Sequence, residues 1–246
     1  MLVQQGEARS SAADRHLAWS LAGIAGALNT AGFYAAGLYS SNMTGNVSAF
    51  ADHIGVGDLA VAILYFALVA TFVSGAAVST LLVNAGRRCG LAGIYAFSIL
   101  AEAILLAGLG CADLWLPGVR RGPALAFGLS FLMGLQNAVV TQISNARVRT
   151  THVTGMVTDI GIELANLIDL VGRSGHEEEV ALNKGKLRLH GQTVASFLAG
   201  GVVGVLAYKA FGAFLLFGAS ALLFLLAGRD ILAAWGGSSR SVLPRG

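Results

Sequence analysis

The sequence predicts an all-α integral membrane protein in which six transmembrane helices form two inverted three-helix repeats. The 246 residues are 55% hydrophobic and only 12% charged, whereas a soluble domain carries roughly 25% charge. Mean hydropathy is +0.70. Six apolar runs are long enough to cross a bilayer, which takes ~17–25 helical residues. A short motif also occurs twice, once in each half of the chain.

The duplicated motif is Ser41-Asn-Met-Thr-Gly45 in the first half and Thr151-His-Val-Thr-Gly155 in the second. Each copy follows an apolar segment with the pattern Gly-x-x-Asn, which ends at Asn29 and at Asn137. The two asparagines are 108 residues apart, and the two Thr-Gly pairs are 110 apart. A repeat at a nearly constant offset indicates two copies of one structural unit.

The predicted spans are, in order, Leu17–Leu38, Leu59–Val83, Leu91–Gly110, Pro123–Thr141, Gly191–Tyr208 and Phe211–Gly228. They divide the chain into a cytoplasmic tail (1–16), a first repeat (17–110), an external linker (111–122), a second repeat (123–228) and a cytoplasmic tail (229–246). A cytoplasmic insertion at 171–190 interrupts the second repeat. A signal peptide is the alternative for the first run, but cleavage there would destroy the repeat.

Basic residues predict the orientation of the spans. With the N-terminus in the cytoplasm, 13 of the 16 Lys and Arg residues lie on the cytoplasmic side, and only Arg120, Arg121 and Lys209 lie outside. Both termini are therefore expected in the cytoplasm. Because each repeat has three spans, the second enters the membrane upside down relative to the first. Inverted repeats of this kind are typical of many secondary transporters.

The two Thr-Gly pairs, Thr44-Gly45 and Thr154-Gly155, lie where helices are expected to begin. Threonine is a favoured N-cap, and glycine leaves the first helical turn uncovered. A helix start with exposed N–H groups is a ready site for an anion. Two interpretations remain open: the pairs are plain structural caps, or they contact one substrate from opposite sides of the membrane.

Three of the polar residues in or near predicted spans are candidates for function: Asn29, Asn137 and Glu102. Asn29 and Asn137 are placed to make interhelical hydrogen bonds, the usual role of such residues, and their symmetric placement also makes them candidates for substrate contact. Glu102 is acidic, and intramembrane carboxylates are functional candidates by default. It is therefore a candidate to carry a coupling proton, although its counterpart in the repeat is the apolar Leu222.

The segment after the second motif copy is amphipathic, with apolar residues on one face and Asp159, Glu163 and Asn166 on another. We expect this helix to lie at the cytoplasmic interface with its acidic stripe in water; lining of an aqueous entrance is the alternative. The charged stretch His176–Arg188 is predicted to be a solvated loop.

The chain resembles the YoaK family of bacterial inner-membrane proteins, which is defined by a domain of unknown function. The resemblance rests on Asn29–Phe33 followed by Ser41–Asn46, and on Gly134–Asn137 followed by Arg149–Gly155. It extends over about residues 17–228. It implies a six-helix protein of the bacterial inner membrane and brings no known substrate or catalytic residues.

The leading functional prediction is a small secondary transporter or permease that binds a small molecule or ion, with an anion favoured by the two helix starts. The alternative is a non-transporting membrane subunit that binds or regulates a partner. No coherent nucleophile and base set is present, so we predict that the protein is not an enzyme. No Cys/His spacing resembles a metal site, and we expect no metal and no cofactor. The lipid bilayer is the expected partner, nucleic acid is not, and glycine-rich faces leave a homodimer open.

Overall fold

The computed structural model describes residues 11–91, 93–170 and 176–238, and this part of the chain forms eight α-helices and no strand. The helices are α1 (Ser11–Ala36), α2 (Met43–Gly55), α3 (Leu59–Arg88), α4 (Ile94–Trp115), α5 (Gly118–Ile143), α6 (Val153–Leu170), α7 (Glu177–Phe211) and α8 (Phe214–Ser238). The predicted all-α fold is confirmed.

Five of the described helices, α3, α4, α5, α7 and α8, are long and apolar enough to cross a membrane. The chain is therefore a multi-pass membrane protein. The first predicted span coincides with α1, which is not among these five. Polar side chains such as Asn29 and Thr30 lower its hydropathy. The sixth span and the inverted arrangement remain predictions.

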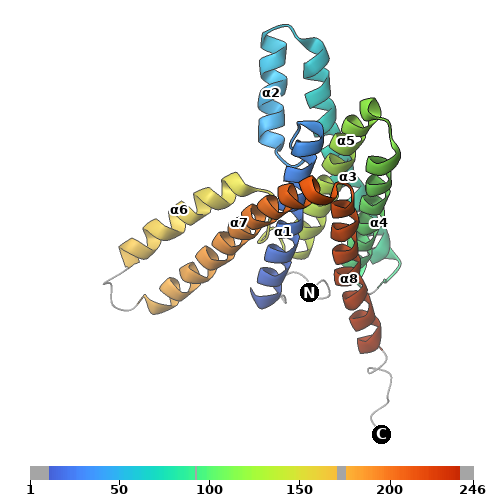
Figure 1. Cartoon of the computed structure of the whole chain (residues 1–246). Helices are drawn as coiled ribbons and strands as arrows, with labels where there is room; N and C mark the ends of the chain where they lie inside the picture. The colour runs from blue at the N-terminus through green and yellow to red at the C-terminus, as the bar shows by residue number, and fades with distance from the viewer. Residues whose placement is uncertain (1–10, 92, 171–175, 239–246) are drawn as a thin grey trace.

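Helix α1 runs along the centre of the bundle and packs against α5, α7 and α8 (Figure 1). Its buried side includes Leu17, Leu21, Ala25 and Leu28, each fully enclosed by protein. Their spacing of four, four and three residues places them on one face of the helix. Because neighbouring helices cover much of α1, fewer of its side chains need to be apolar than in a helix surrounded by lipid.

At two crossings, a helix from one half of the chain packs against a helix from the other half: α1 packs on α7, and α5 packs on α3. Four glycines at these crossings touch the main chain of the opposite helix: Gly26 against Phe197, Gly134 against Phe72, Gly200 against Gly23, and Gly75 against Phe131. A Cβ atom at any of the four would lie 2.0 or 2.1 Å from a backbone oxygen, so only glycine fits. Gly26 and Gly134 open the two Gly-x-x-Asn patterns, and each pattern therefore makes the same crossing.

Helices α2 and α3 form one hairpin, and α6 and α7 form another that extends away from the bundle (Figure 1). The prediction of a loop over His176–Arg188 is wrong, because α7 is continuous from Glu177. Three glutamates in its first turn are placed where carboxylates interact favourably with the helix dipole. Residues 171–175 of the predicted insertion lie outside the described part.

Helix α6 turns part of its acidic stripe towards α7. Glu163 is 4% exposed, its Oε1 atom lies 2.9 Å from Nδ1 of His190, and its carbonyl oxygen accepts from Nδ2 of Asn183 at 2.6 Å. The apolar residues Leu164 and Ile168 are 48% and 77% exposed. The expectation of an acidic stripe in water is therefore wrong at Glu163, because α6 meets α7 through polar groups.

Several helices extend beyond the predicted spans. Helix α4 continues to Trp115 and α5 begins at Gly118, so most of the linker predicted at 111–122 is helical. Helix α1 begins within the predicted N-terminal tail, and α8 continues into the predicted C-terminal one.

Candidate functional site

One cavity, of about 480 Å³, is lined by both copies of the duplicated motif. Four predicted site residues lie in its wall: Asn29, Thr44, Asn137 and Thr154. Pockets that hold small molecules typically measure about 300–1,000 Å³. The structure thus brings together residues from the two chain halves around a space large enough for a small solute.

Phe72 and Phe197 also line this cavity. They stand at the two glycine crossings, where their carbonyl oxygens face Gly134 and Gly26. Sequence reasoning missed both, although a Phe-x-x-Gly pattern occurs in each half, at residues 72–75 and 197–200. Each half of the chain therefore contributes an equivalent aromatic residue to the wall.

The first turns of α2 and α6 reach the cavity, but their caps differ from those predicted. Asn42 is the N-cap of α2, and its Oδ1 atom accepts from the N–H of Gly45 at 3.1 Å. His152 holds the corresponding place directly before α6. Of the two interpretations that the sequence left open, the one in which Thr44 and Thr154 are N-caps is wrong, because each lies inside the first turn of its helix.

The motif glycines make room for the side chain that precedes each helix. A Cβ atom on Gly45 would lie 2.4 Å from Nδ2 of Asn42, and one on Gly155 would lie 2.3 Å from Cε1 of His152. The sequence predicted that the first turns of α2 and α6 are uncovered. In the structure, the side chains of Asn42 and His152 cover them. Neither glycine is among the described residues that line the cavity.

Each asparagine fastens its own copy of the motif. Oδ1 of Asn29 accepts from the N–H of Ser41 at 2.9 Å. Oδ1 of Asn137 accepts from the hydroxyl of Thr151 at 3.0 Å, and its Nδ2 donates to the carbonyl of Met133 at 2.7 Å. Ser41 and Thr151 open the two copies. The asparagines thus have a structural role and also face the cavity.

Arg149 gives the cavity its charge. It is the only Lys, Arg, Asp or Glu among the described residues of the wall, and its Nη1 atom lies 3.2 Å from Nδ1 of His152. The first copy has Tyr39 at the equivalent position, also in the wall. Sequence analysis did not single out Arg149 as a candidate site residue. A guanidinium and two helix N-termini together favour a negatively charged occupant.

Glu102 lies outside the cavity wall. It is fully buried in α4, and its Oε1 atom accepts from Nε2 of Gln136 in α5 at 3.0 Å. Within the described residues, no group of three or more His, Cys, Asp or Glu side chains could hold a metal ion.

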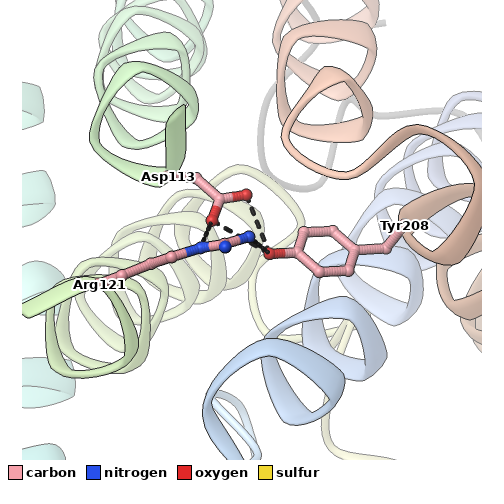
Figure 2. A network of polar contacts seen from close by, with 3 residues as sticks. All are labelled: Asp113, Arg121 and Tyr208. Atoms are coloured by element: carbon pink, nitrogen blue, oxygen red, sulfur yellow. Dashed lines mark hydrogen bonds and ion pairs between the residues drawn. The ribbon is translucent and has the colours of Figure 1, made fainter. Parts of the chain in front are cut away.

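A second polar network joins the ends of α4, α5 and α7, away from the cavity. Figure 2 shows the guanidinium of Arg121 between the carboxylate of Asp113 and the hydroxyl of Tyr208. Arg121 donates to Tyr208 at 2.9 Å, and Tyr208 donates to Oδ2 of Asp113 at 2.9 Å. The side chain of Asp113 has no exposed surface. The network ties the end of α7 to the α4–α5 connection.

A family model described as "Protein of unknown function (DUF1275)" matches residues 17–228. Comparison with curated proteins and with solved structures gives no match. The matched range includes both motif copies, both glycine crossings and every residue of the cavity wall. The chain therefore belongs to the DUF1275 family of proteins of unknown function, to which the YoaK proteins that it resembles also belong.

Proposed function

We propose that this protein is a small secondary transporter that binds its substrate in the cavity between the two motif copies. One observation carries the proposal: two copies of one motif, more than a hundred residues apart in the sequence, line a single cavity of about 480 Å³. Transporters built from inverted repeats bind their substrates at the repeat interface, near the bilayer midplane.

The packing of the first helices supports an inverted arrangement of the two halves. Helices α1 and α5 hold equivalent places in the repeats and contact each other. A Cβ atom on Gly122, near the start of α5, would lie 4.0 Å from Cα of Ala36, the last residue of α1. The two helices therefore run in opposite directions, as Figure 1 also shows.

A small solute with an anionic group fits the wall best. Arg149 supplies a positive charge, the N-termini of α2 and α6 add partial positive charges, and the described wall contains no carboxylate. The amide groups of Asn29 and Asn137 can donate or accept further hydrogen bonds.

The test is solute uptake by the purified protein in liposomes. The panel contains small carboxylates, phosphate and sulfate, each paired with a neutral analogue of similar size. An anion is expected to enter, and Arg149→Gln is expected to reduce its uptake about tenfold or more, because a hydrogen bond to a charged group contributes ~1.5–3 kcal/mol. Arg120→Gln removes an exposed charge that does not line the cavity and serves as the control. If Arg149→Gln transports the anion as fast as the unchanged protein and the control, the cavity is not the substrate site.

The inverted topology is tested separately by cysteine labelling from each side of the membrane. Cys89 and Cys111 are first replaced by serine, and single cysteines are then introduced by Val56→Cys and by His176→Cys. Residue 56 lies in the connection between α2 and α3, and residue 176 directly precedes α7. Impermeant reagents are expected to reach the two positions from opposite sides. Labelling of both from one side would overturn the inverted arrangement.

A second candidate function is a binding or regulatory subunit without transport. The α6–α7 hairpin favours it, because the hairpin extends away from the bundle (Figure 1) and presents Leu164 and Ile168 on its surface. Ligand-dependent thermal stabilisation without flux of the same ligand would favour this function over transport.

A further inference from the structure

We propose that Glu102 is a proton-binding site that controls the second motif copy, and not the first, through Gln136 and Thr150. The inference deepens the proposed function, because these residues connect a buried carboxyl group to the wall of the cavity. Its test measures the motif itself and does not require solute flux.

The carboxyl group of Glu102 has one engaged oxygen and one free oxygen. Oε1 accepts from Gln136, whereas Oε2 has no hydrogen-bond partner in the described part of the protein. A proton can therefore add to Oε2 of the carboxylate, forming a new O–H bond without breaking the existing hydrogen bond. The product is the neutral acid.

The helices packed against this part of α4 offer no charge to compete for the carboxyl group. Residues 59–86 of α3, 122–143 of α5 and 214–228 of α8 contain no acidic or basic residue. Tyr65 in α3 stacks on His53 of α2. In α4 itself, Tyr95 and Cys111 lie about two turns away. The group most directly affected by the charge on Glu102 is therefore its hydrogen-bond donor in α5.

Gln136 passes this contact on to the second motif. Its Oε1 atom accepts from the hydroxyl of Thr150 at 3.4 Å. The same hydroxyl lies 3.5 Å from Oδ1 of Asn137, which also accepts from Thr151 at 3.0 Å. A hydroxyl has one proton, so Thr150 can donate to Gln136 or to Asn137 but not fully to both.

Protonation of Glu102 shifts this balance. A hydrogen bond to an ionised carboxylate is roughly twice as strong as one to a neutral group. The ionised form therefore holds the Gln136 amide firmly, with its oxygen towards Thr150. The neutral form holds it less firmly, and Thr150 then turns towards Asn137, where it competes with Thr151 at the start of the motif.

The first motif copy lacks this connection. The two polar partners are replaced there by Leu28 and Leu222. Ser40, at the position of Thr150, is 1% exposed, and its hydroxyl has no hydrogen-bond partner among the described residues. The repeat has thus kept a buried hydroxyl in both copies and linked only one of them to a carboxyl group.

The two copies provide a reporter and a matched control. In a background with Cys89→Ser and Cys111→Ser, Thr154→Cys reports on the second copy and Thr44→Cys on the first. The rate of reaction with a water-soluble maleimide is measured across pH and divided by the rate for the same reporter combined with Glu102→Gln. This ratio cancels the ionisation of the thiol itself.

The ratio is expected to change about fivefold or more with pH at residue 154 and to stay constant at residue 44. Gln136→Leu, which installs the residue of the first copy, should abolish the change at residue 154. In that variant, infrared spectroscopy should still detect the carbonyl band of a carboxylic acid that appears and disappears with pH. Thr150→Val should also abolish the change, and Thr150→Ser should retain it.

Equal responses at the two reporters, or a response that survives Gln136→Leu, would overturn the inference. If Glu102→Gln fails to fold, the shift of a carboxylic acid band in Glu102→Asp assigns that band to this position, and the absence of a band that both shifts and varies with pH rejects the proton site. Absence of solute flux with an intact response at residue 154 would contradict the proposed transport and leave the proton site standing.

Discussion

The two motif copies share their backbone geometry and differ in the chemistry around it. A helix begins at the third residue of each copy, and the eight residues that start at Ser41 and at Thr151 follow the same order of buried and exposed positions. The surroundings differ, because the second copy has Arg149 and Gln136 where the first has Tyr39 and Leu28. The comparison shows that glycines and asparagines preserve the shape of the repeat, while neighbouring side chains are free to specialise.

The largest expected effect concerns what the copies share. Gly26→Ala and Gly134→Ala each place a Cβ about 2 Å from a backbone oxygen, and overpacking of this kind costs ~1–3 kcal/mol or more. Both should lower the thermal unfolding temperature in detergent by similar amounts. Gly108→Ala and Gly228→Ala, at equivalent positions with open space around them, are the controls and should be neutral or stabilising. Tolerance of only one of the first pair would show that the crossings are not equivalent.

A swap of cavity residues comes next. Arg149→Tyr gives the second copy the residue of the first and should weaken anion binding by ~1.5–3 kcal/mol. Because Tyr39 lines the same cavity, adding Tyr39→Arg should restore part of the affinity. Isothermal titration or thermal stabilisation by the anion identified in the flux screen measures both. No recovery in the double variant would mean that the charge acts only beside His152.

The two asparagines should differ in a predictable direction. Asn137 bonds to Thr151, to Met133 and, over a longer distance, to Thr150, whereas the described contact of Asn29 is with Ser41. Asn137→Ala should therefore cost about 1–3 kcal/mol of unfolding free energy, and Asn29→Ala about 1 kcal/mol. Chemical unfolding in mixed micelles compares them. A larger loss of unfolding free energy in Asn29→Ala than in Asn137→Ala would mean that the hydrogen bonds of the first copy contribute more to stability.

The smallest effects are expected at the motif glycines. Gly45→Ala and Gly155→Ala bring a Cβ against the ends of side chains that can rotate away, those of Asn42 and His152. Loss of the Asn42 cap costs ~1 kcal/mol, and the alanine returns a similar amount in helix propensity. Net stability should change little in either variant. Only Gly155→Ala should alter anion affinity, because it moves His152 away from Arg149.

Repetition in the sequence predicted four of the residues that meet, whereas Gly45 and Gly155, selected on the same ground, do not line the cavity. Asn29, Thr44, Asn137 and Thr154 were selected because they recur, and the structure places all four in one cavity wall. The cap was not predictable in the same way. Asn and Thr are both favoured N-caps, and Asn42 precedes Thr44 by two residues, so the choice depends on the path of the chain.

Two other features lay beyond what hydropathy reports. Hydropathy identifies segments that contact lipid, but it does not report whether a charged segment is helical. The charged start of α7 was therefore predicted to be a loop. The pairing of Glu102 with Gln136 depends on how α4 meets α5, and a single sequence does not contain that contact. In contrast, the Phe-x-x-Gly patterns at residues 72–75 and 197–200 were readable and identify a third pair of equivalent positions.

The packing of helices from one half against the other also affects how the chain is made. Helix α1 is synthesised first, yet the hydroxyl of Thr30 donates to the carbonyl of Gly201, 171 residues later. At about 5–20 residues per second, a ribosome needs roughly 10–30 seconds to cover that distance. During this time α1, which is not among the helices apolar enough to cross a membrane, has no complete α7 beside it, and it has no complete α5 until residue 143 has been made. Assembly of the central helix is therefore completed late in translation, and a nascent chain that stops after α4 should leave α1 open to protease.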